Sequence, residues 1–196
     1  MSTHQLDVYE CIRDELLFQE TVKMQICQDS QMEYQDDSPR SVAGWLLLVK
    51  GKYDDIVYSL SHEAGTLYTL GQLRELAALC IQCIMEHGGF GRQPNGTLIR
   101  LNYVKPLGMD LAWDVAVLER KYQDSFGPER TDGHAHSISE YLVMFDTYRR
   151  TAFDAWTHNV GDEAAIQIIG KLLGIVVHCL EDHGAPKREW DHVRRP

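Results

Sequence analysis

The chain has 196 residues, of which 44% are hydrophobic, and it carries a formal net charge of −10 at pH 7. This length and apolar content are typical of one globular domain or two small ones, and they exclude wholesale disorder. The negative charge disfavours general binding to nucleic acid or to anionic membranes, because both require a basic face. It is compatible with cation binding or with mimicry of a polyanion.

The amino-terminal residues Met1 to Gln5 lack the basic and apolar regions of a secretory signal. We find no run of about 18 apolar residues, so we expect no segment that spans a bilayer. The five cysteines are an odd number without the spacing of a disulfide framework, which favours a reducing compartment. We therefore expect a cytoplasmic protein with no membrane partner.

Helical periodicity of apolar residues indicates three helices in the first part of the chain. The first is expected over residues 5–28. The second begins near Ser41, which is a good N-cap residue, and its apolar stripe continues to Leu60. The third is expected over about 67–87. Gly88 follows where a left-handed C-cap belongs, so the third helix should end there.

Residues 89–107 differ because glycine and proline interrupt them, and they are interpreted as a linker. Alternation of apolar and polar residues over 99–103 predicts one short extended segment within it. Three further helices follow: one over about 108–124, one with an apolar stripe over 138–156, and a last one that ends before Gly184. The end of the chain is polar and is expected to be a frayed tail.

Two segments of the chain repeat each other at an offset of 96 residues. Gln82 to Gly88 matches His178 to Gly184, and the alignment extends without a gap over 41–88 and 137–184. The identical pairs are Ser41/Ser137, Leu46/Leu142, His62/His158, Gly65/Gly161, Leu76/Leu172, Cys83/Cys179, His87/His183 and Gly88/Gly184. Because the apolar positions also stay in phase, we interpret the chain as a tandem duplication of one helical hairpin.

The repeat predicts an all-α fold of about six helices in two helical units related by a pseudo-two-fold axis. The expected division is 1–88 for the first unit, 89–107 for the linker, 108–188 for the second unit and 189–196 for a polar tail. Each hairpin is too small to bury its apolar stripe alone, so the halves should pack as an internal pseudo-dimer. A homo-oligomer is also compatible with this plan.

The repeated motif resembles that of small helical phage proteins described as MazG-like. It consists of Ser-Val or Ser-Ile, then Trp-Leu or Tyr-Leu, a striped helix, and a second helix that ends in Cys-x-x-x-His-Gly. The resemblance covers 41–88 and 137–188, about half of the chain. MazG-like all-α pyrophosphohydrolases cleave nucleoside triphosphates to monophosphates. The resemblance therefore implies a phage-encoded protein of the host cytoplasm that binds a nucleotide, with Mg²⁺ as cofactor if it is an enzyme.

That family holds Mg²⁺ with Glu-Glu-x-x-Glu on one helix and Glu-x-x-Asp on the next, because hard carboxylates clamp the metal. This chain contains neither motif at the matching positions. The candidate catalytic acids that remain are Asp54, Asp55, Glu75, Asp146, Asp154 and Glu163. The positions that correspond to Glu-x-x-Asp hold Gln72 and Glu75 in one unit, and Ile168 and Lys171 in the other. Lys171 argues against intact chemistry, and the other interpretation is that the acids form solvated helix faces.

Cysteine and histidine recur together at the ends of the two hairpins. Cys83 and His87, like Cys179 and His183, are four residues apart and share a helix face. Across a pseudo-two-fold axis the four could form a Cys₂His₂ zinc site. The interpretation we favour is structural, with the cysteines filling the core and the histidines ending the helices.

Two further groups could bind a ligand. Arg92, Arg100 and Lys105 in the linker, with Asn95, form a small basic group that could contact the phosphates of a nucleotide or an acidic partner. Asp132 to His136 contains a His-x-His pair that could ligate a metal. The alternative in both cases is a soluble loop.

The sequence leaves two functions open. The first is a divergent nucleotide-binding protein with residual Mg²⁺-dependent pyrophosphohydrolase activity. The second is a non-catalytic acidic phage protein that keeps the scaffold and binds a host protein, for example to inhibit a defence protein. The convergence or scattering of the candidate acids distinguishes the two.

Overall fold

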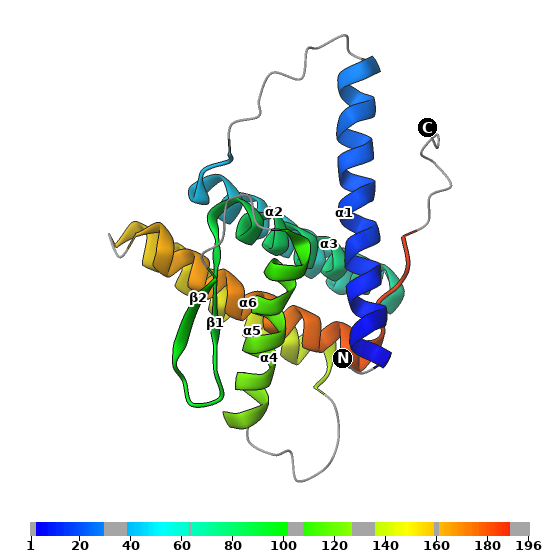
Figure 1. The fold of residues 1–196 in the computed structure, drawn as a ribbon. Helices are drawn as coiled ribbons and strands as arrows, with labels where there is room; N and C mark the ends of the chain where they lie inside the picture. The colour runs from blue at the N-terminus through cyan, green and yellow to red at the C-terminus, as the bar shows by residue number, and fades with distance from the viewer. Residues whose placement is uncertain are drawn as a thin grey trace.

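The computed structural model describes residues 3–29, 39–62, 64–101, 108–126, 136–158 and 161–188. Within them the chain forms six helices and one two-stranded hairpin (Figure 1), which confirms the all-α fold class. In chain order the elements are α1 Thr3–Asp29, α2 Val42–Ser61, α3 Thr66–His87, β1 Gly89–Arg92, β2 Leu98–Leu101, α4 Met109–Phe126, α5 Ile138–Thr157 and α6 Asp162–His183. Each of the six expected helices is present with bounds close to those predicted.

The segment expected to be a linker contains two strands rather than one. β1 and β2 pair antiparallel, with Gly89 opposite Leu101 and Arg92 opposite Leu98. β1 also packs against α4 and α6, so this hairpin forms part of the packed body. The backbone of β1 approaches α4 closely because Gly89 and Gly91 lack side chains. A Cβ at Gly91 would lie 2.4 Å from a methyl carbon of Leu118.

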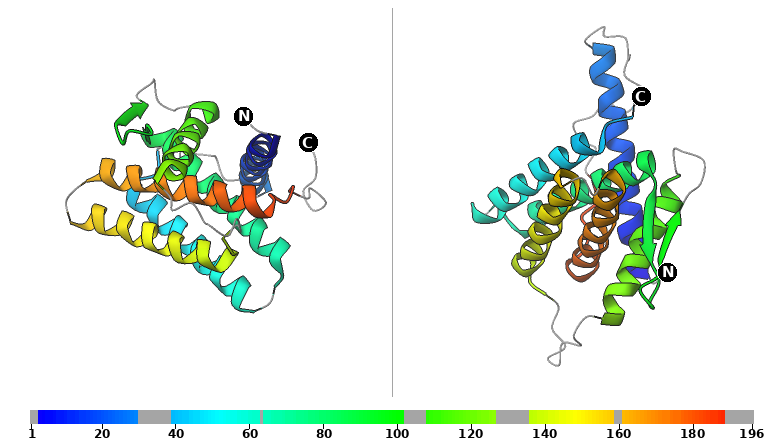
Figure 2. Two further views of the ribbon diagram at one scale, coloured as in Figure 1. Left: turned by 90° about the horizontal axis from the view of Figure 1, so that it is seen from below. Right: turned by 90° about the vertical axis from the view of Figure 1, so that its left-hand side faces the viewer.

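Helix α6 lies at the centre of the fold. It packs against α3, α4, α5 and β1, and the left view of Figure 2 shows it between α4 and α5. Its buried residues are Ala165, Ile166, Ile168, Ile169, Gly170, Leu172, Leu173, Gly174, Ile175, Val176, Val177, Cys179 and Leu180. Apart from the two glycines, they belong to one core cluster that also includes Ile12 of α1 and Trp45 of α2, so both predicted units contribute to the same core.

By length and composition α6 could cross a membrane, because its apolar window of 18 residues has a mean hydropathy of 1.6. The core helix of a globular protein passes the same test. In this structure 72% of that window is buried within the protein. The apolar character of α6 is therefore accounted for by its central position.

The two repeated hairpins have the same local design. α2 and α5, and likewise α3 and α6, begin and end at positions 96 residues apart. Ser41 and Ser137 both cap the first helix with the hydroxyl group, which accepts a hydrogen bond from a backbone N–H. Gly88 and Gly184 both have a φ of 89° after the second helix, a conformation that favours glycine. The caps expected from the sequence are therefore present in both hairpins.

Candidate functional site

The first hairpin carries its candidate acids around a lysine. Lys52 on α2 reaches across to α3, where its ammonium group lies 3.0 Å from Gln72 Oε1 and 2.7 Å from Glu75 Oε2. Asp55 Oδ2 is 3.6 Å from the same nitrogen. Gln72 and Glu75 are the positions that the sequence resemblance aligns with the metal-binding Glu-x-x-Asp of the MazG-like enzymes. The ammonium group of Lys52 is therefore bonded to the two residues at which the resemblance implies a metal ion.

The other acid of this hairpin points away from that group. Asp54 pairs with Lys50 on the outer face of α2, at 2.6 Å, and its side chain is 54% exposed. The structure thus brings Asp55 and Glu75 to one lysine and leaves Asp54 on a solvated face. An exposed pair of this kind contributes little to stability, because water screens both charges.

The candidate acids of the second hairpin do not converge on one site, and those that form ion pairs have different partners. Asp146 accepts hydrogen bonds from Arg149 and Arg150, which outweigh the opposing effect of burial and hold its pKa below the ordinary value. Glu163 pairs with Arg100 of β2 at 2.8 Å. Asp154 is exposed near the end of α5, where its backbone carbonyl accepts the helix-ending N–H of His158.

The repeated cysteines and histidines have separate structural roles. Cys83 and Cys179 are fully buried, and burial raises the pKa of both thiols, to about 12 for Cys179. His87 Nε2 lies 2.7 Å from the carbonyl oxygen of Arg40, and His183 Nε2 lies 2.7 Å from that of His136. In the described ranges no three His, Cys, Asp or Glu side chains are placed to hold a metal ion together.

The two basic linker residues that lie in the described part of the chain, Arg92 and Arg100, are each paired with a glutamate. The single Nε–H of Arg92 is shared between the two carboxylate oxygens of Glu119, each at 2.9 Å, and Arg92 Nη2 also donates to Glu119 Oε2. The guanidinium group of Arg92 lies 3.7 Å from the ring centre of Tyr122. Arg100 pairs with Glu163, as described above. Lys105 lies outside the described residues, as do Asp132 to Ala135. The described members of the basic group therefore hold the β-hairpin to α4 and α6.

A buried ionic network that is not among the candidate sites named from the sequence connects α1, α3 and the segment after α6. Arg74 Nε donates to Glu15 Oε2 at 3.0 Å, and both side chains are almost completely buried, at 3% and 1% exposed. Arg188 pairs with Glu75 Oε1 at 2.7 Å, so Lys52 and Arg188 bind opposite oxygens of Glu75. Burial raises the pKa of Glu15, although Gln19, Arg74 and Arg188 all act to lower it.

A sequence signal for this network exists in the apolar stripes. Arg74 stands at helical spacing among Leu70, Leu73 and Ala77, and it shares their buried face. A charged residue on such a stripe is rarely buried without a partner. The partner, Glu15, is 59 residues away, so periodicity alone does not identify it.

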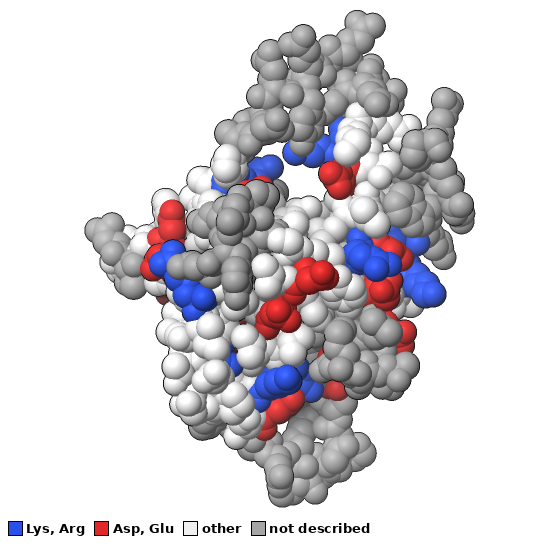
Figure 3. Space-filling view, viewed as in Figure 1, with Lys and Arg blue, Asp and Glu red and all other residues white. Residues whose placement is uncertain are grey.

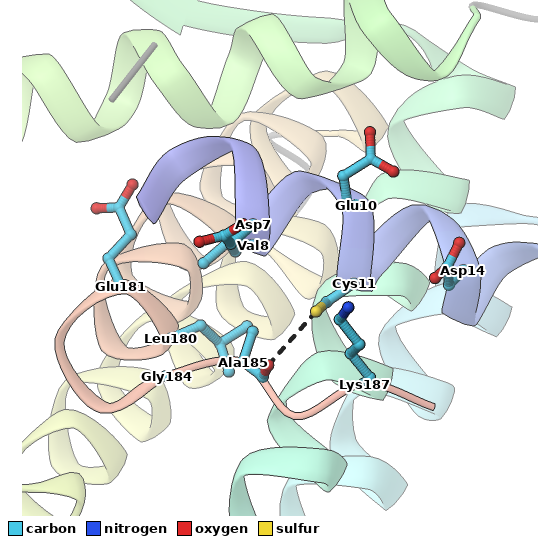
Figure 4. A pocket seen from close by; sticks show the side chains of 10 residues that line it. All are labelled: Asp7, Val8, Glu10, Cys11, Asp14, Leu180, Glu181, Gly184, Ala185 and Lys187. Atoms are coloured by element: carbon cyan, nitrogen blue, oxygen red, sulfur yellow. Dashed lines mark hydrogen bonds between the residues drawn. The ribbon is translucent and has the colours of Figure 1, made fainter. Parts of the chain in front are cut away.

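An acidic hollow of about 530 Å³ lies between α1 and the end of α6. Figure 4 shows Asp7, Glu10 and Asp14 on the side of α1 and Glu181 on α6, with Lys187 as the basic side chain among the lining residues. The thiol of Cys11 donates a hydrogen bond to the carbonyl of Ala185 at 3.4 Å. On the face drawn in Figure 3, most Lys and Arg side chains lie beside Asp or Glu.

Comparison of the chain with protein-family models, with curated proteins and with solved structures gave no match.

Proposed function

We propose that this chain is a non-catalytic helical protein that keeps the hairpin plan of the MazG-like enzymes and binds a protein partner. The observation that carries the proposal is the position of Lys52, whose ammonium group is bonded to Gln72 and Glu75. Pyrophosphohydrolysis of this class needs a divalent cation held by carboxylates. Here a lysine of the same chain neutralises the carboxylate instead.

Displacing Lys52 would be costly. Its side chain is only 19% exposed and that of Glu75 is 17% exposed, so their attraction is weakly screened by water. Mg²⁺ requires oxygen ligands at about 2.0–2.1 Å in an octahedral arrangement. A metal ion at Glu75 would therefore be held close to the ammonium group of Lys52 and the guanidinium group of Arg188, and like charges at such distances repel.

The second hairpin supports the same proposal by a different substitution. Lys171 occupies the position that corresponds to the Asp of Glu-x-x-Asp, and burial lowers its pKa, as does Arg92 nearby. Ile168, at the other position of the pair, is buried. Neither hairpin therefore offers the paired carboxylates on its second helix. The matching helix bounds and caps of the hairpins support an origin by tandem duplication.

Exposed apolar side chains support a role in protein binding. Around the turn between α2 and α3 the large exposed hydrophobic residues are Val57, Tyr58, Leu60, Leu67 and Tyr68. Leu67 is 71% exposed, which is costly for an aliphatic side chain unless another surface covers it. With a net charge of −10, the chain suits a partner with a basic surface. If the chain is phage-encoded, that partner is a host protein.

The proposal is tested by thermal melting of the purified protein with Mg²⁺ and a panel of nucleoside triphosphates, with pyrophosphate measured in the same wells. We expect neither a shift in melting temperature nor release of pyrophosphate. Release that is lost in Glu75→Gln but kept in Glu163→Gln would establish the enzyme and overturn the proposal. A shift without release would instead favour a nucleotide-binding scaffold.

A further inference from the structure

We propose that residues Gly184–Arg188 form a displaceable plug that keeps Arg188 in an arginine-binding site, and that an arginine of a basic protein partner takes this site in its place. This inference rests on the proposed function, because it names the chemistry of the partner. The arginine site consists of Phe18, Glu15 and Glu75. In Figure 1 the described end of the chain runs beside α1, where these contacts form.

The arginine site contacts the guanidinium group of Arg188 in two ways, through the ring of Phe18 and through the carboxylates of Glu15 and Glu75. The carbon at the centre of the Arg188 guanidinium group lies 3.8 Å from the ring centre of Phe18. Arg188 Nη1 lies 2.7 Å from Glu75 Oε1 and 3.7 Å from Glu15 Oε2. A planar guanidinium group can stack on an aromatic ring while it donates hydrogen bonds in its own plane. An ammonium group lacks this geometry, so the site should prefer arginine to lysine.

The carboxylates of the site are held in place without Arg188. Glu15 is bound by Arg74 at 3.0 Å and by Gln19 at 2.9 Å. Glu75 is bound by Lys52 at 2.7 Å. Because these bonds do not involve Arg188, its departure leaves both acids in position. A preorganised site of this kind loses little conformational entropy when a second arginine binds.

The plug has no regular secondary structure, and Ala185 is its residue that packs against the hydrophobic core. After α6 ends, residues 184–188 form neither helix nor strand. Apart from Arg188, the hydrogen bonds that attach this segment to α1 and α3 are those from Cys11 to the carbonyl of Ala185 and from Arg74 to the carbonyl of Pro186. A hollow of about 420 Å³ opens beside Arg188 and is lined by Phe18 and Val22 of α1. This hollow gives an incoming segment apolar surface next to the arginine site.

Arg188 competes with an arginine of the partner because Arg188 is covalently tethered beside the site. A segment tethered beside its site has an effective concentration of about millimolar, so it strongly competes with a weak ligand in solution. Removal of the Arg188 side chain should therefore increase the affinity for an arginine peptide about tenfold or more. Lys187 provides the matched control, because it is adjacent and exposed, carries the same charge and does not line the hollow beside Arg188.

The test uses fluorescence anisotropy with a labelled seven-residue peptide that has one central arginine between alanines, and with its lysine counterpart. We expect Arg188→Gln to bind the arginine peptide about tenfold tighter than the wild type or Lys187→Gln. Adding Phe18→Ala to Arg188→Gln should abolish the preference for arginine. Equal affinity of the wild type and Arg188→Gln, or equal binding of the two peptides, would overturn the plug.

A second measurement does not depend on the folding of a variant. The side-chain Nε–Hε signal of Arg188 in the ¹⁵N-labelled wild-type protein should move toward its solvent-exposed position as the arginine peptide is added, and an unchanged signal at saturation would contradict displacement. Pyrophosphate release is measured separately. Release would overturn the proposed function and leave the peptide result standing, whereas unchanged peptide binding would overturn the plug alone.

Discussion

Replacing Arg74 by methionine should destabilise the protein strongly. Methionine keeps much of the side-chain volume of Arg74, but it removes the donors to Glu15 and to the carbonyl of Pro186. Because Arg74 and Glu15 are 3% and 1% exposed, the variant leaves a buried carboxylate without its main partner. Removing one member of a buried ion pair costs about 3–5 kcal/mol of unfolding free energy.

Equilibrium unfolding in urea, followed by circular dichroism, measures this loss. The double variant Arg74→Met with Glu15→Gln should lose less than the sum of the two single variants, because no buried charge is then left unpaired. The exposed pair of Lys50 and Asp54 is the control, and Lys50→Met should change stability by less than about 1 kcal/mol. A loss below about 1 kcal/mol for Arg74→Met would show that the buried pair is not structurally important.

The remaining predictions concern packing and pH. Gly170→Ala should destabilise the protein, because the added Cβ would lie 2.9 Å from Val115 Cγ1. In Gly71→Ala the added Cβ meets nothing within 4 Å, so this variant should stabilise α3 by about 0.5–1 kcal/mol. Thermal melting of the two variants measures the difference. Burial lowers the pKa of His178 from 6.5 to about 4, despite the nearby Asp182. Between these values the unfolded chain binds the proton and the folded chain does not, so stability should fall as the pH is lowered from 6.5 toward 4. The variant His178→Gln places at this position the residue type that the first hairpin has at Gln82, and it should flatten this dependence of stability on pH. An unchanged pH profile of the melting temperature would show that His178 is not its cause.

Much of the helical architecture can be predicted from the sequence because helix ends have local causes. Ser41 and Ser137 cap a helix with their own side chains, and Gly88 and Gly184 adopt a positive φ that other residues disfavour. Strand β1 is different. Two of its four residues, Gly89 and Gly91, are glycines, which are depleted in strands, so its intrinsic strand propensity is low. It is positioned by close packing against α4.

The candidate site could be predicted only in part, because its important contacts cross between distant elements. The sequence identifies Glu75 as a candidate acid and Lys171 as a departure from the motif of the MazG-like enzymes that the repeat resembles. It does not indicate that Lys52 turns toward α3, since a lysine on a helix with apolar and polar faces usually points to solvent. Similarly, Arg188 lies 113 residues from Glu75, and nothing in its local sequence identifies that partner.

In the proposed function, Lys52 takes the place of a metal ion in the first hairpin. Titration of Mg²⁺ into the wild-type protein, followed by isothermal titration calorimetry at low ionic strength, tests it most directly. We predict no saturable binding, because Glu75 is already bonded to Lys52 and Arg188. Stoichiometric binding of Mg²⁺ that disappears in Glu75→Gln would contradict the claim.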